Sequence, residues 1–231
     1  MSVDVVAIIP ARGGSSRIPG KNAKEFNGRP IITWPLEACS QAASISQTIV
    51  STDDEKIARI ARNAGATSVI DRPAALATDT AGTAPVIRHA IDDLDVDDDA
   101  VVICLYPTAT LTAAIVDEAL DISRQHPDMF VVTVGRHRSP HERSLETRVG
   151  NLMSLSSTEH LLTRTQDLPQ RYFDAGKLYV AQASVWKARD TMMEVPFVPF
   201  HLPDWAAVDI DEPEDWAIAE ALHRVFVLET S

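Results

Sequence analysis

The segment "VDVVAIIPARGGSSRIPGKN", residues 3–22, decides the fold class because it joins an apolar strand to a glycine-rich, cationic loop. Val and Ile dominate Val5–Ile9, and such a run without polar alternation is typical of a strand that is covered on both faces. The loop that follows gathers glycines, prolines and three cations, Arg12, Arg17 and Lys21. Glycine-rich turns with cations bind anions well, so the segment predicts an anion site directly behind the first strand.

The positive charge of this loop is local. Residues 11–30 hold five Lys or Arg side chains against Glu25 alone, a net charge of +4. Because the whole chain has a net charge of −12, the remaining residues carry a net charge of −16. A solvated surface loop is the alternative interpretation of such a cluster. The position after a strand, and a length unusual for a strand-to-helix connection, favour a site for a small, highly charged anion.

Length and composition favour one globular domain over residues 1–231, since 45% of the residues are hydrophobic. No apolar run approaches the ~20 residues of a membrane-spanning helix, and the N-terminus lacks the pattern of a secretion signal. We therefore expect a soluble, cytoplasmic protein with no membrane or nucleic-acid partner, the latter because of its acidic balance. Cys39 and Cys104 are expected to be buried free thiols.

Short apolar runs alternate with helical patterns along the chain. The predicted strands are Val5–Ile9, Thr48–Ser51, Val101–Leu105 and Phe130–Val134. The predicted helices span approximately residues 52–65, 83–94, 111–126 and 213–228, with Thr83 as a possible N-cap and with Ile218, Leu222 and Val225 on one face of the last helix. This alternation predicts an α/β fold, a Rossmann-like three-layer sandwich around a mostly parallel sheet, in which ligands bind outside the carboxyl ends of the strands.

Residues 136–175 break the alternation. They are polar, but they include Leu152, Met153, Leu155, Leu161 and Leu162. We interpret this segment as a small insertion that serves as a lid or as an oligomer contact.

Two well-known phosphate loops do not fit residues 10–22. The Walker A pattern fails because five residues separate Gly14 from Gly20 and because Asn22 follows Lys21 where Ser or Thr is required. The dinucleotide pattern fails because Ser15 stands where the second glycine after Gly13 should be. The loop of nucleotidyltransferases, which couple a nucleoside triphosphate to a sugar, remains.

A family resemblance now becomes specific. The block "AIIPARGGSSRIPGKN" resembles the signature of the cytidylyltransferases that activate nine-carbon and eight-carbon keto sugar acids, the CMP-nonulosonic acid synthetase (acylneuraminate cytidylyltransferase) family. Four later blocks agree in order: "IVSTDDEKIA", "DRPAALATDTAGT", "TRTQDLPQRYFDAGKLYV" and "VDIDEPEDW". The resemblance covers nearly the whole chain. Within the family, "YPTA", "TRTQDL" and "FDAGKLYV" are most similar to the pseudaminic acid cytidylyltransferase subgroup.

The resemblance gives the first loop a role, because in this family it wraps the triphosphate of CTP. Arg12, Arg17 and Lys21 would then offset charge on the phosphates and on the departing pyrophosphate, with Arg12 and Lys21 acting in catalysis. Asn22 would donate through its amide. The backbone of Ala11, Gly13 and Gly14 completes the predicted phosphate site. An ordinary surface arginine is the alternative for Arg17.

The block "DRPAALATDTAGT" matches the family segment that lies against the nucleoside. Arg72 is a candidate for the base carbonyl, and Ala81, Gly82 and Thr83 are candidates for backbone and hydroxyl contacts. The alternatives are structural: Arg72 could brace its loop, and Thr83 could be a helix cap.

Asp209 and Asp211 are candidate Mg²⁺ ligands. Side chains at i and i+2 of an extended chain share one face, and Mg²⁺ is commonly held by one or two carboxylates together with substrate phosphates. The resemblance assigns this role to the same Asp-x-Asp, and we expect Asp211 to be catalytic. Glu212, Glu214 and Asp215 are attributed to the start of the last helix. His137 and His141 lack further zinc ligands and are assigned to a loop.

The second substrate is expected to be an acidic nine-carbon sugar, whose carboxylate needs a cation. Arg164 matches the sugar-proximal arginine of the family, and a bidentate pair would orient the anomeric hydroxyl. Further candidates for the sugar site are Tyr106, Arg143, Gln166 and Asp174. The chain departs from the sialic acid enzymes at "PTATLT", where they carry "PTSPLR", at Tyr106, where they carry Gln, and at residues 174–176, where they carry Arg-Pro-Asn-Gly.

The sequence therefore predicts transfer of CMP from CTP to a nonulosonic acid, with pseudaminic acid favoured, pyrophosphate released and Mg²⁺ as cofactor. A homodimer formed through residues 136–175 is expected from the resemblance. Two alternatives stay open. One is a cytidylyltransferase for another acid, such as N-acetylneuraminic, legionaminic or an eight-carbon keto acid. The other is a non-catalytic nucleotide-binding regulator on the same fold.

Overall fold

A seven-stranded sheet forms the centre of the protein. The computed structural model describes residues 4–15 and 17–229, so Ser16 of the glycine-rich loop lies outside the described residues. The strands run in the order β11 (Val198–His201), β7 (Val131–Arg136), β10 (Tyr172–Gln182), β6 (Val101–Leu105), β1 (Val5–Pro10), β4 (Gln47–Thr52) and β5 (Ser68–Asp71). Only β10 is antiparallel to its neighbours, which confirms the α/β sandwich around a mostly parallel sheet.

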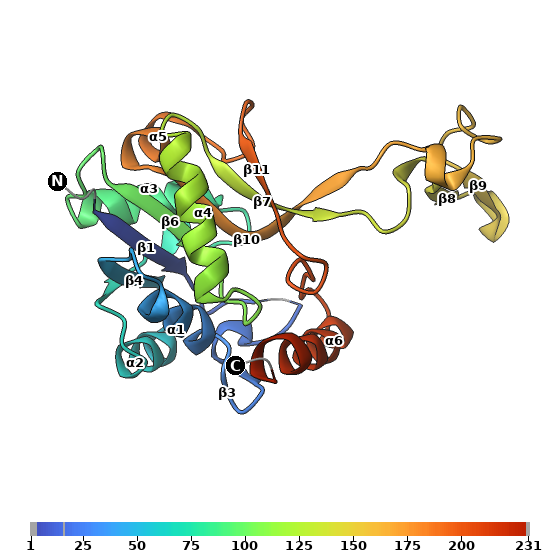
Figure 1. Cartoon of the computed structure of the whole chain (residues 1–231). Helices are drawn as coiled ribbons and strands as arrows, with labels where there is room; N and C mark the ends of the chain where they lie inside the picture. The colour runs from blue at the N-terminus through green and yellow to red at the C-terminus, as the bar shows by residue number, and fades with distance from the viewer. Residues whose placement is uncertain (1–3, 16, 230–231) are drawn as a thin grey trace.

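Helices cover both faces of this sheet (Figure 1). One face packs against α1 (Thr33–Gln41), α2 (Glu55–Asn63) and α4 (Ala113–Gln125), and the other against α3 (Thr83–Asp93) and α5 (Ala183–Ala188). Among the described residues, no helix has the length and apolar character needed to cross a membrane.

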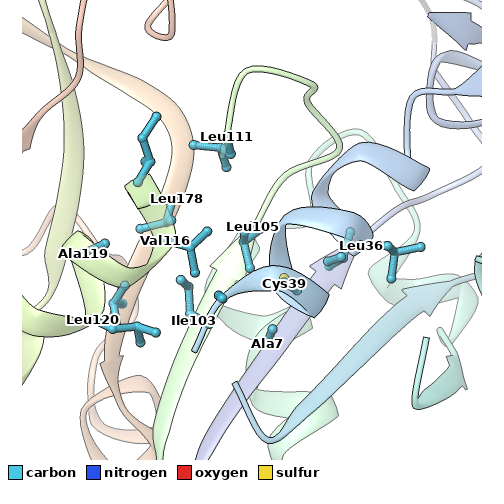
Figure 2. Packing of buried hydrophobic residues seen from close by; sticks show 14 of the residues in the cluster. Ala7, Leu36, Cys39, Ile103, Leu105, Leu111, Val116, Ala119, Leu120 and Leu178 are labelled. Atoms are coloured by element: carbon cyan, nitrogen blue, oxygen red, sulfur yellow. The ribbon is translucent and has the colours of Figure 1, made fainter. Parts of the chain in front are cut away.

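The apolar runs of the sequence form the two cores that these layers enclose. Figure 2 shows the first, in which Leu36 and Cys39 of α1 and Val116 of α4 pack over Ile103 and Leu105 of β6. The second buries Ile87 of α3 and places Trp186 against Phe130. Cys39 and Cys104 are both buried and free, as expected. Burial raises the pKa of the Cys39 thiol to about 12, so this thiol is protonated at neutral pH.

The four predicted strands are present, but the sequence patterns missed the other three strands of the central sheet. β5, β10 and β11 are short or interrupted by polar residues; β10 carries Asp174, Gly176 and Lys177 within its length. The predicted N-cap at Thr83 is wrong by one residue, because Gly82 is the N-cap of α3. The Thr83 hydroxyl instead hydrogen-bonds the hydroxyl of Tyr106.

The segment between β7 and β10 extends away from the sheet as an arm, which we define as residues 137–171 (Figure 1). At its base, Tyr172 of β10 pairs with Arg136 of β7. Its outer part holds a small hairpin of β8 (Leu145–Thr147) and β9 (Met153–Leu155). Several apolar side chains of the arm are exposed to solvent, including Val149 (97%), Leu162 (95%) and Leu152 (69%).

The last helix, α6 (Pro213–His223), continues into a π-helical turn, Arg224–Leu228. The face of Ile218, Leu222 and Val225 is not its buried face, since Ile218 and Val225 are about half exposed (48% and 50%). The buried residues of α6 are Trp216, Ala219 and His223. This face is buried because it packs against the rings of Phe26, in the hairpin of β2 (Glu25–Phe26) and β3 (Arg29–Pro30), and of Trp34 in α1. Glu212 and Asp215 form a reciprocal capping box at the start of α6, which confirms their structural assignment.

Candidate functional site

A cavity of about 370 Å³ lies where the sequence predicted a ligand, beyond the carboxyl ends of the parallel strands. Pro10 at the end of β1, Arg72 after β5 and Tyr106 after β6 contribute to its wall. Twelve of the predicted site residues line it: Arg12, Gly14, Arg17, Lys21, Asn22, Arg72, Ala81, Gly82, Thr83, Tyr106, Asp209 and Asp211. The structure thus gathers the separate sequence blocks around one space.

The glycine-rich loop is fixed by backbone contacts at both ends. The amide of Ala11 donates to the carbonyl of Ser51 (2.9 Å), and the side-chain amide of Asn22 donates to the carbonyl of Arg12 (2.9 Å). Gly20 adopts a left-handed conformation (φ +64°) before the short 3-10 helix Lys21–Ala23. Asn22 therefore braces the loop in this chain, while its predicted contact with phosphate is untested.

Gly13 lies against the segment that follows β4. Its amide donates to the Asp53 carboxylate (2.8 Å), and a Cβ placed on Gly13 would approach a carboxylate oxygen of Asp54 to 2.7 Å. Only glycine tolerates this approach without movement of the α2 N-cap, Asp54. Asp53 is thus a positioning residue that sequence reasoning missed, because nothing in "STDDEKIA" indicates which acid faces the loop.

Two cations of the loop are paired with carboxylates across the cavity. Arg12 Nη2 lies 2.6 Å from Asp79 Oδ1, and Arg17 Nη1 lies 2.6 Å from Asp211 Oδ2. All four side chains are partly exposed, with Arg17 at 60% and Asp79 at 68%. Exposed pairs contribute only about 0–1 kcal/mol, so an incoming anion can replace these partners at little cost.

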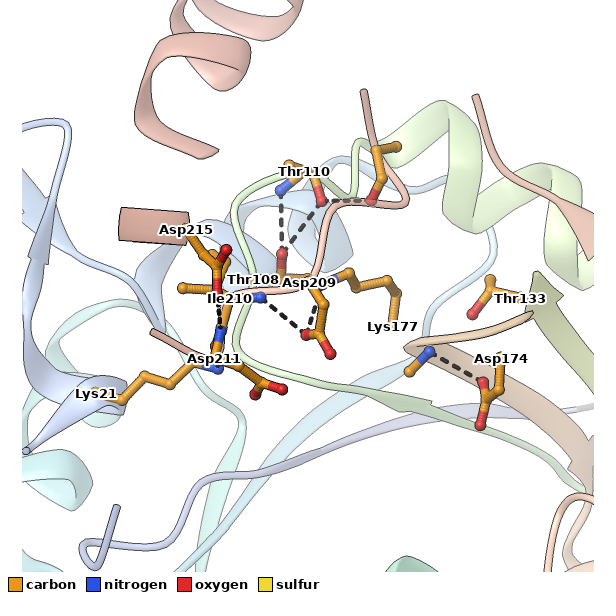
Figure 3. A network of polar contacts seen from close by, with 12 residues as sticks. Lys21, Thr108, Thr110, Thr133, Asp174, Lys177, Asp209, Ile210, Asp211 and Asp215 are labelled. Carbon is orange, nitrogen blue, oxygen red and sulfur yellow. Dashed lines mark hydrogen bonds and ion pairs between the residues drawn. The ribbon is translucent and has the colours of Figure 1, made fainter. Parts of the chain in front are cut away.

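Lys21 lies at the meeting point of the loop and the Asp-x-Asp segment. Its ammonium donates to the carbonyl of Ile210, between the two acids (Figure 3). Burial lowers the pKa of Lys21, while the charges of Asp209 and Asp211 oppose that shift. A lysine held in this way supplies a fixed positive charge at the edge of the cavity.

The wall predicted to face the nucleoside contains a buried arginine. Arg72 donates from Nη2 and Nε to the carbonyl and hydroxyl oxygens of Ser51 (2.6 and 3.3 Å), so it braces the sheet edge as the structural alternative proposed. It also lines the cavity. Beside it, Tyr106 shares a hydrogen bond with Thr83, and burial raises the pKa of the Tyr106 phenol. Tyr106 is therefore a neutral hydroxyl at physiological pH.

Asp209 and Asp211 both line the cavity, and their positions fit a divalent cation. Each carboxylate is partly exposed (side chains 65% and 39%), and each already lies beside a cation, Lys177 and Arg17 respectively. Two carboxylates open to a phosphate-sized space are the donor set that Mg²⁺ accepts when phosphates and water complete its shell. No cluster of three or more His, Cys, Asp or Glu residues occurs in the described part of the chain, so a site held by protein ligands alone is not formed there.

β10 contributes two residues to the wall of the cavity. Asp174 does not line the cavity; its carboxylate accepts hydrogen bonds from Tyr179 Oη (2.8 and 2.9 Å) and from the amide of Gly176 (3.0 Å). Gly176 and Lys177 do line it. Lys177 is buried (3% exposed) and was not predicted, because a single lysine in a strand pattern normally indicates an exposed position.

Besides Asp174, three more predicted sugar residues are not at the cavity. Arg143, Arg164 and Gln166 lie in the arm, and none lines the cavity of this chain. Arg143 donates to the carbonyls of Leu161 and Thr163 (3.2 and 2.6 Å), so it stabilises the arm itself. Arg164 and Gln166 are exposed. Ala11 is fully buried below the loop, and Gly13 faces Asp53 and Asp54.

Comparison with known proteins agrees with this geometry. The family model described as cytidylyltransferase matches residues 6–213. A pseudaminic acid cytidylyltransferase of Campylobacter jejuni serotype O:2 is 31% identical over 223 residues, which cover 95% of this chain and 96% of the relative. A CMP-N,N'-diacetyllegionaminic acid synthase of Legionella pneumophila is 31% identical over 94% of this chain and 95% of its own.

The fold is also that of solved nucleotidyltransferases. The structure of CMP:2-keto-3-deoxy-manno-octonic acid synthetase in complex with CTP superposes with a TM-score of 0.69 over 98% of this chain and 99% of the other, at 19% identity. A 4-diphosphocytidyl-2C-methyl-D-erythritol synthase superposes with a TM-score of 0.67 at 11% identity. The match over nearly the full length, together with the relatives at 31% identity, shows that this chain belongs to the cytidylyltransferase family.

Proposed function

We propose that the protein transfers CMP from CTP to the anomeric hydroxyl of a nonulosonic acid and releases pyrophosphate. The observation that carries this proposal is the convergence of Arg12, Arg17 and Lys21 with Asp209 and Asp211 around one cavity in a cytidylyltransferase. Relatives that cover the whole chain are named for CMP transfer to pseudaminic and legionaminic acids.

The loop is the phosphate-binding half of the proposed site. CTP would displace Asp79 from Arg12 and Asp211 from Arg17, and it would place its triphosphate against these cations and Lys21. The anomeric hydroxyl then attacks the α-phosphorus in line and loses its proton to solvent, the bond between the α-phosphorus and the oxygen that bridges to the β-phosphate breaks, and pyrophosphate leaves with that oxygen. Cations that are preorganised around the leaving group stabilise the charge that develops on it, which lowers the barrier more than contacts made equally in the ground state.

We propose that Asp209 and Asp211 hold Mg²⁺ when CTP is bound. The ion would supply charge neutralisation for the phosphates and would lower the pKa of an oxygen bound to it. The Asp211 carboxylate, once released from Arg17, has an oxygen free for this role. Asp209 would keep Lys177, which is buried, as a neighbour.

Among the sugar acids, pseudaminic acid is the proposed substrate. Two relatives from Campylobacter jejuni with the pseudaminic acid name are 31% identical over 95% of the chain. Legionaminic acid is the runner-up, because the legionaminic acid enzyme has the same identity over a similar share of the chain. The wall made by Tyr106 and Gly176–Lys177 contains two of the residues by which this chain departs from the sialic acid pattern, Tyr106 and Gly176.

We further propose that the arm forms a homodimer contact and that the enzyme works in the cytoplasm, where CTP is available. Val149, Leu152 and Leu162 expose apolar surface on a segment that packs little against its own domain. In such a dimer, Arg164 could serve the sugar end of a cavity that it does not reach within one chain.

Product identification tests the proposed function. The purified protein, CTP, Mg²⁺ and pseudaminic acid should give the CMP-sugar and pyrophosphate in equal amounts, detected by mass spectrometry and a coupled phosphate assay. Consumption of CTP without a sugar nucleotide, or no reaction with any nonulosonic acid, would contradict the proposal.

A further inference from the structure

The cavity contains a buried lysine that the phosphate chemistry does not use. Lys177 lies in β10, only 3% of its surface is exposed, and it lines the cavity beside Asp209. The loop already provides Arg12, Arg17 and Lys21 for the phosphates. A fourth cation, held in the wall beside Asp209, therefore indicates a second anionic group in the site.

The protein itself satisfies this ammonium only in part. Its nearest carboxylate oxygen is Asp209 Oδ1 at 3.6 Å, which is longer than a hydrogen bond (Figure 3). The same Oδ1 accepts the amide of Ile210 at 2.9 Å. An ammonium has three N–H donors, and the long ion pair with Asp209 is the one charged partner that the described residues provide for Lys177 Nζ. Burying a charge with so little compensation is costly, so a bound ligand is expected to complete its shell.

The position of Lys177 favours a contact with the sugar acid over a contact with the nucleotide. Its carbonyl accepts the amide of Tyr106 (3.0 Å), which joins β10 to the wall that follows β6. The nucleotide already has predicted partners of its own, since Arg72 and Gly82 are the candidate nucleoside contacts and the glycine-rich loop is the candidate phosphate site. The wall where Lys177 meets Asp209 has no such partner assigned and is left for the acceptor.

We infer that Lys177 binds the carboxylate of the acceptor sugar acid and thereby sets which class of sugar the enzyme accepts. This inference rests on the proposed function. In a 2-keto sugar acid, the carboxylate and the anomeric hydroxyl are attached to the same carbon. A fixed cation on the carboxylate consequently restricts the nucleophile to the region beside Asp209, which is the end of the site where the α-phosphate must be attacked.

The competing explanation is that Lys177 only neutralises Asp209. Both roles predict a weaker enzyme when the charge is removed, so a single variant does not separate them. The two roles differ in one respect. If Lys177 contacts the sugar carboxylate, its removal should slow the reaction of the sugar acid but not that of an analogue without the carboxylate.

A cycle of two substrates and two enzymes makes this distinction. The substrates are the sugar acid and its carboxamide, and the enzymes are wild type and Lys177→Met, which keeps the apolar stem. Lys187→Met is the matched control. Lys187 lies on α5, does not line the cavity, and also forms an ion pair with an aspartate, Asp98 (2.7 Å). For each pair, kcat/KM for the acceptor and KM for CTP are measured.

Wild type should prefer the acid over the amide by about 10- to 100-fold in kcat/KM, as expected for a hydrogen bond between charged groups. Lys177→Met should lose a similar factor with the acid, should show little preference between acid and amide, and should keep its KM for CTP. Lys177→Gln, which retains a donor, should lie between the two. Lys187→Met should behave as wild type.

Two results would overturn the inference. If Lys177→Met and Lys177→Gln keep the full preference for the acid, Lys177 does not contact the carboxylate. If they lose activity equally with acid and amide and raise KM for CTP, Lys177 acts only through Asp209. Both results leave the proposed function intact. A wild-type enzyme that is inactive with every sugar acid contradicts the proposed function itself and removes the basis of this inference.

Discussion

Arg17 and Asp211, which lie near opposite ends of the sequence, form an ion pair of 2.6 Å at the cavity. One was predicted to bind phosphate and the other to bind Mg²⁺, and in the ligand-free chain they neutralise each other. Arg12 is paired with Asp79 in the same way. The site is thus preassembled with internal counter-ions, and binding of CTP and a cation would exchange them for the ligand's own charges.

Asp211→Asn should lower kcat by on the order of 10²-fold or more at saturating CTP, as loss of one electrostatic stabiliser can. The free energy of unfolding should change by less than about 1 kcal/mol, because the pair with Arg17 is partly exposed and Arg17 remains solvated. Steady-state rates over a Mg²⁺ titration and urea unfolding measure the two effects.

Glu214→Gln is the matched control for that variant. Glu214 lies in the first turn of α6, but the capping box uses Glu212 and Asp215 instead. Catalysis should be nearly unchanged in this variant. Normal turnover of Asp211→Asn at limiting Mg²⁺, with a defective Glu214→Gln, would refute the metal assignment.

Asp53→Ala should raise KM for CTP more than it lowers kcat. The Asp53 carboxylate accepts the amide of Gly13 (2.8 Å), and without it the loop loses a charge-assisted hydrogen bond worth about 1.5–3 kcal/mol. The expected increase in KM is therefore about 10- to 100-fold. Glu55→Ala, which removes an exposed neighbour at the start of α2, should leave KM unchanged. Equal KM values for both variants would show that Asp53 does not position the loop.

Leu162→Asp should convert the proposed dimer to monomer. Leu162 is 95% exposed in the single chain, and loss of a buried leucine contact weakens association by about 1.5–3 kcal/mol, or about 10- to 100-fold in Kd. Light scattering over a concentration series measures the change. Ile218→Asp on α6 introduces the same charge at a half-exposed site outside the arm and should leave the mass unchanged. A wild-type protein that is monomeric and fully active at assay concentration would rule out the dimer.

His223 should make the fold acid-sensitive. It is fully buried between the rings of Phe26 and Trp34. Its Nδ1 accepts a hydrogen bond from the side-chain amide of Asn27 (3.0 Å), and its Nε2 has no hydrogen-bond partner among the described residues. Burial lowers the pKa of His223 to about 4, and the positive charge of Arg29 acts in the same direction against a smaller opposing effect of Glu37.

Because this pKa lies below the ordinary value of about 6.5, the unfolded chain binds the proton more tightly than the folded one. The stability that neutral His223 provides is complete above about pH 6.5 and is lost as the pH falls toward 4. Between pH 8 and pH 5 the loss from this group is about 2 kcal/mol. Between pH 8 and pH 5, the free energy of unfolding of His223→Gln, measured in urea, should therefore fall by about 2 kcal/mol less than that of wild type. His201→Gln, at an exposed histidine, should follow wild type, and a pH dependence of His223→Gln equal to that of wild type would contradict the assignment.

The sequence predicted the parts of the fold that depend on local patterns. β1, β4, β6 and β7 are continuous runs of apolar and β-branched residues, because parallel strands are covered on both faces. β10 was missed because Asp174, Gly176 and Lys177 interrupt its pattern, and its antiparallel direction leaves no mark in the residues themselves. The buried face of α6 was also missed, because it depends on the rings of Phe26 and Trp34 from distant segments.

The site was predictable where a motif fixes a loop, and much less so where function depends on contacts between distant segments. Arg12, Lys21, Asp209 and Asp211 could be proposed from their blocks, and the structure places them around one cavity. The ion pair of Arg12 with Asp79 and the hydrogen bond that Asp53 accepts from Gly13 join segments that are far apart in the sequence. The spacing of residues within one motif therefore could not predict them. Arg164 and Gln166 match the family pattern, yet they lie in the arm rather than at the cavity of their own chain.

The measurement that tests the central claim most directly is pyrophosphate release over a matrix of nucleotides and sugar acids. CTP with pseudaminic acid should give the highest kcat/KM; CTP should greatly exceed UTP, ATP and GTP, and N-acetylneuraminic acid should be a poor acceptor. Similar efficiencies for pseudaminic and N-acetylneuraminic acids would overturn the substrate assignment but not the reaction class. Equal turnover with CTP and UTP, or no pyrophosphate with any sugar acid, would contradict the account as a whole.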